Sequence, residues 1–180
     1  MSPASTRQAE PAYQAAQLAT YQRHCEGWNR HDLDAALSIY TDDAHYEEKS
    51  LRWDLHGLDE IRDQFGPWFA NTSDTRCWVE DSVHAPDRAA FMWRVTGLHV
   101  SGHRFDLPGI SLLSFTPDWQ VSHDVALWNL ADLPEQAAKD IGIDTAAAYG
   151  IPIRAAANGR GTSAARIADS LRTRQQPTRC

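Results

Sequence analysis

The chain has 180 residues and a net charge of −7, which suits a single domain with a sizeable core and argues against a nucleic-acid partner. Three cysteines without metal-ligand spacing favour reduced thiols and a cytoplasmic location. No apolar run approaches the ~20 residues of a membrane-spanning helix, so we expect no membrane contact.

Three helices are predicted after a flexible N-terminus over residues 1–12. Apolar side chains recur at spacings of three and four along 13–30, which is typical of an amphipathic helix: Leu18, Tyr21, Cys25 and Trp28. Asp32 is a favourable N-cap for a second helix. Gly57 precedes a third helical pattern, and we expect that helix to end near Gly66-Pro67.

The segment "DDAHYEEKS", residues 42–50, alternates in the manner of a strand. Successive strand side chains point to opposite faces, so Glu48 shares a face with Tyr46. If Tyr46 faces the interior, Glu48 does as well, and burying a carboxylate is costly unless it is paired, hydrogen-bonded or neutral. Glu48 is therefore either a functional group or a strand-end carboxylate that pairs with Arg52 or Arg62.

Residues 76–129 are predicted to form an antiparallel meander of three or four strands. Short turns separate the strand-like segments, one at Ser101-Gly102 and one at Pro117-Asp118. Helices followed by a sheet give an α+β fold. One more helical piece is expected over 132–150, which would complete a domain over residues 13–150.

The segment 151–180 is rich in Ala, Gly and Arg. Residues 154–180 hold six arginines against the single acid Asp169, so this stretch carries +5 and, within the total of −7, the rest of the chain carries −12. We expect either a solvated, disordered tail or an intermolecular contact with the acidic body.

Five segments resemble the SnoaL-like group of the nuclear transport factor 2-like superfamily. They are "NRHDLDAALSIYTDDAHYEE" (29–48), "HGLDEIRDQF" (56–65), "WRVTG" (93–97), "FDLPGISLLSF" (105–115) and "ALWNLADLPEQ" (126–136). The resemblance implies a cone-shaped α+β fold, in which a curved, antiparallel-rich sheet lies over three to four helices with a pocket at the open end. Relatives commonly dimerise through the outer face of the sheet, so a homodimer is expected as well.

Similarity to the ketosteroid isomerases of this superfamily implies three catalytic positions. The general base falls on Glu48, a catalytic tyrosine on His24 and a second oxyanion donor on Ser111, and all three residue types differ from those of the isomerases. A base on one side of a pocket and donors on the other suit the removal of a proton beside a carbonyl. The alternatives are a solvent-edge histidine at His24 and a small packed residue at Ser111.

The last strand supplies two further expectations. In epoxide hydrolases and SnoaL-type cyclases this strand ends with catalytic aspartate, whereas residues 126–129 here hold no acid. His123 and Asp124 are adjacent and face opposite sides, and we expect His123 to be the pocket acid/base. The expected substrate-binding residues are mostly aromatic: Tyr46, Trp28, Trp93, Leu113, Phe115, Trp128 and Asn129.

No metal and no organic cofactor are expected, because the sequence lacks a His-Glu-x-x-His pair and a Gly-rich phosphate loop. We therefore predict an acid/base lyase, isomerase or cyclase that acts on an apolar carbonyl-containing small molecule, in secondary metabolism or catabolism. The alternative is a non-catalytic small-molecule-binding or assembly protein of the same fold. The missing acids of 126–129 favour this alternative, and an inward Glu48 favours the enzyme.

Overall fold

The computed structural model describes residues 11–129 and Asp132. Its three helices are α1 (Ala12–Asn29), α2 (Leu33–Leu37) and α3 (Leu58–Asn71). Its six strands are β1 (Tyr40–Glu48), β2 (Trp53–His56), β3 (Thr72–Ala85), β4 (Arg88–His99), β5 (Arg104–Phe115) and β6 (Val121–Trp128). Among these residues no helix is long and apolar enough to span a bilayer.

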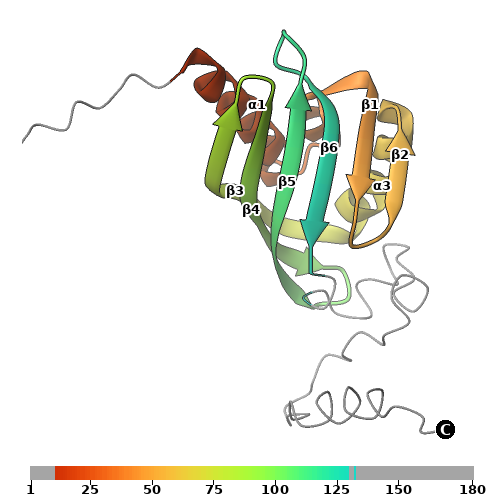
Figure 1. Cartoon of the computed structure of the whole chain (residues 1–180). Helices are drawn as coiled ribbons and strands as arrows, with labels where there is room; N and C mark the ends of the chain where they lie inside the picture. Colours follow the sequence, from red (N-terminus) through yellow and green to blue (C-terminus); the bar gives the residue numbers. More distant parts are fainter. Residues whose placement is uncertain (1–10, 130–131, 133–180) are drawn as a thin grey trace, which may run out of the picture.

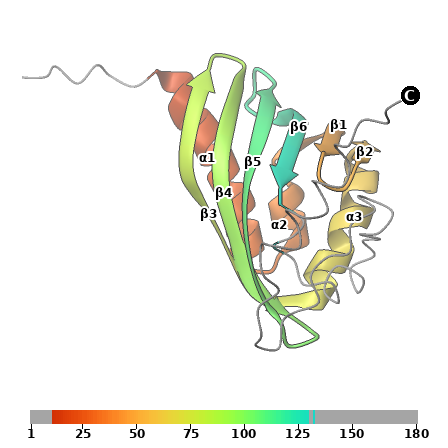
Figure 2. The ribbon, with the colours of Figure 1, turned by 60° about the horizontal axis from the view of Figure 1, so that its bottom comes forward.

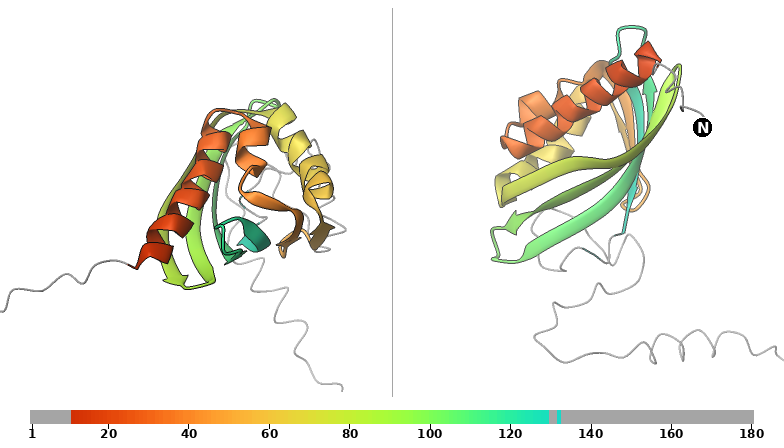
Figure 3. Two further views of the ribbon diagram at one scale, coloured as in Figure 1. Left: turned by 90° about the horizontal axis from the view of Figure 1, so that it is seen from above. Right: turned by 90° about the vertical axis from the view of Figure 1, so that its left-hand side faces the viewer.

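The six strands form one mixed sheet in the order β2-β1-β6-β5-β4-β3. All neighbouring pairs are antiparallel except β1 and β6, which run parallel. In Figure 1 the helices lie behind the strands, and Figure 2 shows the sheet bending around them. The end-on view in Figure 3 shows that the same concave face carries all three helices. The predicted α+β cone is confirmed.

The local sequence explains most of these elements. Asp32 caps α2, since its side chain accepts a hydrogen bond of 2.9 Å from the Ala35 N–H. The tight turn at Ser101-Gly102 is present. Gly102 has a φ of +85°, a left-handed conformation that costs glycine little, and its N–H donates to the His99 carbonyl over 2.8 Å.

Two features of the fold differ from the sequence-based expectation. The third helix does not end at Gly66-Pro67 but continues to Asn71, with Pro67 inside it. A proline removes one helical hydrogen bond, and burying Trp68 and Phe69 in the next turn outweighs that loss. The short strand β2 was not predicted, because four residues with one buried side chain, Leu55, give no clear alternation.

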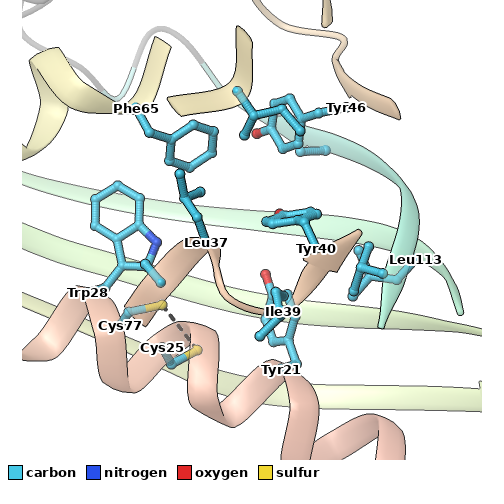
Figure 4. Close-up of a cluster of buried hydrophobic side chains, with 14 of the residues drawn as sticks. Tyr21, Cys25, Trp28, Leu37, Ile39, Tyr40, Tyr46, Phe65, Cys77 and Leu113 are labelled. Carbon is cyan, nitrogen blue, oxygen red and sulfur yellow. Dashed lines mark hydrogen bonds between the residues drawn. The ribbon is translucent and has the colours of Figure 1, made fainter. Parts of the chain in front are cut away.

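The predicted helical piece over 132–150 and the basic tail over 151–180 lie outside the described residues, apart from Asp132. Within the described part, the core fills the space between the concave face and the helices. Figure 4 shows Tyr21, Cys25 and Trp28 of α1 facing side chains from the sheet, among them Tyr40 and Tyr46. The aromatic side chains of α1 and of the sheet therefore surround the same space between the helix and the strands.

Close packing of α1 on α2 predicts a stability effect at Gly27. A Cβ there would overlap the backbone nitrogen and Cα of Ala36, which belong to a neighbouring helix and cannot rotate away. We expect Gly27→Ala to lower the free energy of unfolding by about 2–3 kcal/mol, although alanine is the better helix former. Urea denaturation measures this change.

The matched control is Gly66→Ala in α3, where an added Cβ meets nothing within 4 Å. This substitution should raise the free energy of unfolding by about 0.5–1 kcal/mol. Equal effects of the two substitutions would contradict the close approach of α1 and α2.

Candidate active site

A cavity of about 80 Å³ lies between the concave face of the sheet and the helices. Five of the seven tryptophans line it, one from each of five elements: Trp28, Trp53, Trp68, Trp93 and Trp128. Four polar side chains other than tyrosine also line it: His24, Glu48, Ser111 and Asp124. An apolar cavity with a few converging polar groups is the usual form of a small-molecule site.

Glu48 lies at the end of β1 and faces this cavity on the same side as Tyr46, as the alternation of the strand predicts. Its side chain is 1% exposed. One carboxyl oxygen, Oε1, accepts a hydrogen bond of 2.7 Å from the Ser50 N–H, while Oε2 has no partner within the described part of the chain. Arg62 instead pairs with Asp34, so the surface ion-pair alternative is not supported.

Burial raises the pKa of Glu48 from its ordinary value near 4.5 to about 7. The backbone N–H and hydroxyl of Ser50 lower this pKa in part, and the negative charge of Asp124 raises it further. Ser50 is held in place by the end of β6, because the Trp128 N–H donates to its hydroxyl over 3.0 Å. Glu48 therefore changes protonation state near neutral pH.

Asp124 on β6 is the second carboxyl group in the cavity, with 2% exposure. Its Oδ2 accepts a hydrogen bond of 2.8 Å from the Tyr40 hydroxyl, and Oδ1 has no partner among the described residues. Burial raises the pKa of Asp124 to about 7, against the lowering effect of the nearby Tyr40 and Ser111 hydroxyls.

The parallel pairing of β1 and β6 sets the distance between the two carboxyl groups. Tyr46 lies opposite Asp124, and Glu48 lies opposite Ala126. The two acids are therefore one strand and two residues apart on one face, a separation of roughly 8 Å between Cα atoms. The negative charge of Asp124 raises the pKa of Glu48, so the protonation of the two groups is linked.

The expectation that His123 is the pocket acid/base is wrong. Its side chain lies on the outer face, where Nε2 contacts Glu47 Oε1 at 3.0 Å, and Asp124 points inward instead. The cause is a β-bulge. Val121 pairs with Phe115 and His123 with Ser114, so β6 has one extra residue between them. The bulge shifts the alternation, and Asp124 rather than His123 follows Val121 on the inner face.

His24 lies in the cavity wall, but both of its ring nitrogens are occupied. Nδ1 contacts the Ala36 carbonyl at 2.8 Å, and Nε2 contacts the Trp28 Nε1–H at 2.9 Å. A carbonyl only accepts and an indole N–H only donates, so Nδ1 carries the proton and Nε2 does not. Burial lowers the pKa of His24 to about 4, which keeps the ring neutral. His24 thus fixes Trp28 and has no N–H left for a ligand.

Ser111 is buried in the cavity wall and accepts a hydrogen bond of 3.2 Å from Trp93 Nε1. Of the expected substrate-binding residues, four line the cavity: Tyr46, Trp28, Trp93 and Trp128. The other three do not. Leu113 and Phe115 are buried core residues, and Asn129 is exposed beside Asp132.

Three tyrosines of the cavity wall remain protonated at neutral pH. Burial raises the pKa of Tyr21, Tyr40 and Tyr46 well above the ordinary value, and the negative charge of Asp124 raises it further in each. Tyr40 donates to Asp124, as described above. The cavity therefore combines two carboxyl groups with neutral hydroxyl donors.

Two cysteines adjoin the cavity without a disulfide. Cys25 of α1 and Cys77 of β3 are both buried and free, with 3.2 Å between their sulfur atoms (Figure 4). The hydrogen bond with Cys25 and burial raise the pKa of the Cys77 thiol. The raised pKa makes Cys77 a poor nucleophile, because thiolates rather than thiols are nucleophiles.

Comparison with known proteins identifies the fold. The sequence model of the SnoaL-like domain matches residues 21–123. No curated protein sequence is significantly similar to the chain. Hundreds of solved structures match it, at low sequence identity in the examples that follow.

Three of these structures show how different the proteins with this fold are. PrhC from Penicillium brasilianum is 17% identical over 76% of this chain and 91% of its own, with a TM-score of 0.61. A protein with a ketosteroid isomerase-like fold from Catenulispora acidiphila, in complex with trimethylamine, is 14% identical over 66% and 92%, with a TM-score of 0.58. SalBIII, an epoxide hydrolase/cyclase-like enzyme, is 13% identical over 66% and 95%, also at 0.58.

The raised pKa of Asp124 predicts a pH-dependent stability. Between about pH 4 and pH 7 the folded state keeps the proton that the unfolded state has lost, so this contribution to stability falls as the pH rises. For one titrating group, the free energy of unfolding changes by at most about 1.4 kcal/mol per pH unit. Asp124→Asn lacks the titration, so the stability of wild type minus that of the variant should fall from pH 4 to pH 7.

Urea denaturation of both proteins at several pH values measures this difference. His24 titrates in both proteins, so its contribution cancels in the stability difference. Asp43→Asn, which removes an exposed acid of β1 outside the cavity wall, is the matched control. A flat difference for Asp124→Asn would show that folding does not raise the pKa of Asp124.

Proposed function

The chain belongs to the SnoaL-like domain family, and we propose that it is an acid/base enzyme acting on an apolar carbonyl compound. The single observation that carries the proposal is the pair Glu48 and Asp124. Two carboxyl groups face one apolar cavity, each has an oxygen without a partner among the described residues, and each has a pKa of about 7. Groups with such pKa values transfer protons efficiently at neutral pH.

We assign the base to Glu48 and the acid to Asp124. The Ser50 backbone N–H can only donate, so it favours the ionised form of Glu48. The Tyr40 hydroxyl beside Asp124 can either donate or accept, so it tolerates a protonated Asp124. With Glu48 ionised, its charge also favours the neutral form of Asp124.

The proposed step is enolisation. Glu48 takes a proton from the carbon next to the substrate carbonyl, and the C–H electron pair moves to form the enolate. Asp124 donates a hydrogen bond or its proton to the enolate oxygen. Return of the proton to another carbon gives isomerisation, loss of a leaving group gives elimination, and attack on a second carbonyl carbon gives ring closure.

The cavity wall supports an apolar substrate. Tryptophan and tyrosine side chains offer flat apolar surface, so a planar or cyclic apolar ketone fits better than a charged metabolite. SalBIII, which shares the fold, is described as acting in pyran ring formation in the polyether salinomycin, so this fold can hold a ring-closing enzyme. Because of the same similarity to SalBIII, we propose that this protein acts in secondary metabolism.

A non-catalytic binding protein is the second candidate. The observation in its favour is that His24 and Ser111, the expected oxyanion donors, both make hydrogen bonds inside the protein. A binding protein would keep the aromatic cavity and show no proton transfer. The next experiment separates the two candidates.

Proton exchange tests the proposed step without knowledge of the natural substrate. A panel of apolar cyclic ketones is incubated with the protein in D₂O, and deuterium incorporation beside the carbonyl is followed by NMR. The wild type should accelerate exchange for part of the panel. Glu48→Gln should lose at least about 100-fold of that rate, as expected for removal of a general base.

Asp124→Asn should lose a comparable factor, since it removes the proposed acid. The matched controls are Glu26→Gln and Asp43→Asn, which alter exposed carboxylates outside the cavity and should keep the wild-type rate. Tryptophan fluorescence reports ketone binding in the same samples. Binding without exchange in the wild type would refute the enzyme and establish the binding protein.

We also propose a homodimer through the outer face of the sheet. Met92, Ile110 and Leu127 lie opposite one another across β4, β5 and β6, and each is 40–50% exposed. Such an apolar row on three adjacent strands is typical of an interaction surface.

Light scattering should give the dimer mass at micromolar concentration. Ile110→Glu places a charge in the middle of the row and should give monomers, whereas Val100→Glu, an exposed residue beyond the end of β4, should leave the dimer intact. A monomeric wild type would contradict the proposal.

A further inference from the structure

Three histidines form a ladder on the outer face of the sheet, away from the cavity. His56, His45 and His123 lie directly opposite one another on β2, β1 and β6. Their rings stack, with centroids 4.4 Å apart for His45 and His56 and 4.6 Å apart for His45 and His123. The proposed reaction uses none of them.

Two carboxylates accompany the ladder. Glu47 Oε1 lies 3.0 Å from His123 Nε2, and Asp54 Oδ1 lies 2.6 Å from His45 Nε2. The ligand atoms of His45, Glu47 and His123 all lie within 4.8 Å of one another. Those of His45, Asp54 and His56 do so as well.

We propose that His45, Glu47 and His123 bind a divalent transition-metal ion of the zinc type. Imidazole nitrogen and carboxylate oxygen are the ligands that such ions prefer. Zinc binds them at about 2.0–2.2 Å, so tetrahedral ligand atoms lie roughly 3.3–3.5 Å apart. The 3.0 Å between Glu47 and His123 is close to this value. The rings of His45 and His123, now parallel, would have to turn so that a nitrogen of each points at one ion. The fourth position would take water.

The three half-buried residues form a better site than the alternative set around Asp54. The side chains of His45, Glu47 and His123 are 34%, 21% and 37% exposed, whereas those of Asp54 and His56 are both 67% exposed. Ordering an exposed side chain costs more conformational entropy. In addition, the three proposed ligands come from the internal strands β1 and β6, whereas Asp54 and His56 belong to β2 at the edge of the sheet.

One neighbouring charge opposes the metal. Lys49 makes an ion pair with Glu47 Oε2 and is half-exposed. Its side chain can turn to solvent when the metal binds, because only Oε1 of Glu47 is needed as a ligand. The favourable carboxylate of Asp54 lies on the other side, next to His45. The net local charge therefore still favours a cation.

The proposed metal lies directly behind the cavity acids. His45 and Glu47 flank Tyr46, Glu47 precedes Glu48, and His123 precedes Asp124. A bound ion would join the two strands whose opposite face carries the carboxyl pair. The sequence alone gave no indication of this site, because its ligands come from strands 76 residues apart rather than from a local motif.

Calorimetric titration of the full chain, without a histidine tag and after chelator treatment, tests the site with Zn²⁺. We expect one ion per chain. His45→Ala and His123→Ala should abolish binding, and Glu47→Gln should weaken it at least tenfold. The matched control His56→Ala, which removes the third histidine of the ladder, should stay within threefold of wild type. Circular dichroism confirms that each variant is folded.

Co²⁺ provides an independent readout, because its visible spectrum reports the ligand type. We expect weak d–d bands without the intense near-ultraviolet absorption of a thiolate ligand. Absence of binding, unchanged binding in His123→Ala, loss of binding in His56→Ala, or a thiolate spectrum would each overturn the proposal. None of these outcomes bears on the exchange reaction, so the two proposals fail separately.

Discussion

The parallel pairing of β1 with β6 is the contact on which the candidate site depends. It joins an early strand to the last strand of the sheet, and it places Glu48 and Asp124 on the same inner face. The antiparallel pairs around it extend the sheet and supply the aromatic wall. A shift of β6 by one residue against β1 would turn Asp124 to the outer face while Glu48 stayed inside, and the carboxyl pair would be lost.

This arrangement costs stability. Two carboxyl groups are almost fully buried, and in the part of the chain that the structure describes each leaves one oxygen without a partner. The protein reduces the cost in two ways: Ser50 and Tyr40 each satisfy one oxygen, and burial raises both pKa values so that a neutral form becomes accessible. Sites that break the usual rules of burial in this way are commonly functional.

Much of the fold could be predicted from the sequence, because hydrophobic spacing and turn residues mark the elements from α1 to β6. Alternation along residues 42–50 also placed Glu48 on the inner face. Asp124 was missed, because a β-bulge changes the alternation of β6 and leaves no mark in the local pattern. His24 was found, but its role depends on Trp28 and Ala36, contacts that only the folded chain reveals.

The most direct test of the account measures the protonation of the two inner acids. Carbon-13 NMR of protein labelled at the carboxyl carbons of Asp and Glu follows each group through a pH titration. Two resonances should titrate with apparent pKa values near 7, and one should disappear in each of Glu48→Gln and Asp124→Asn. If all carboxyl resonances titrate below pH 5, neither group is poised for proton transfer, and the account of the site is wrong.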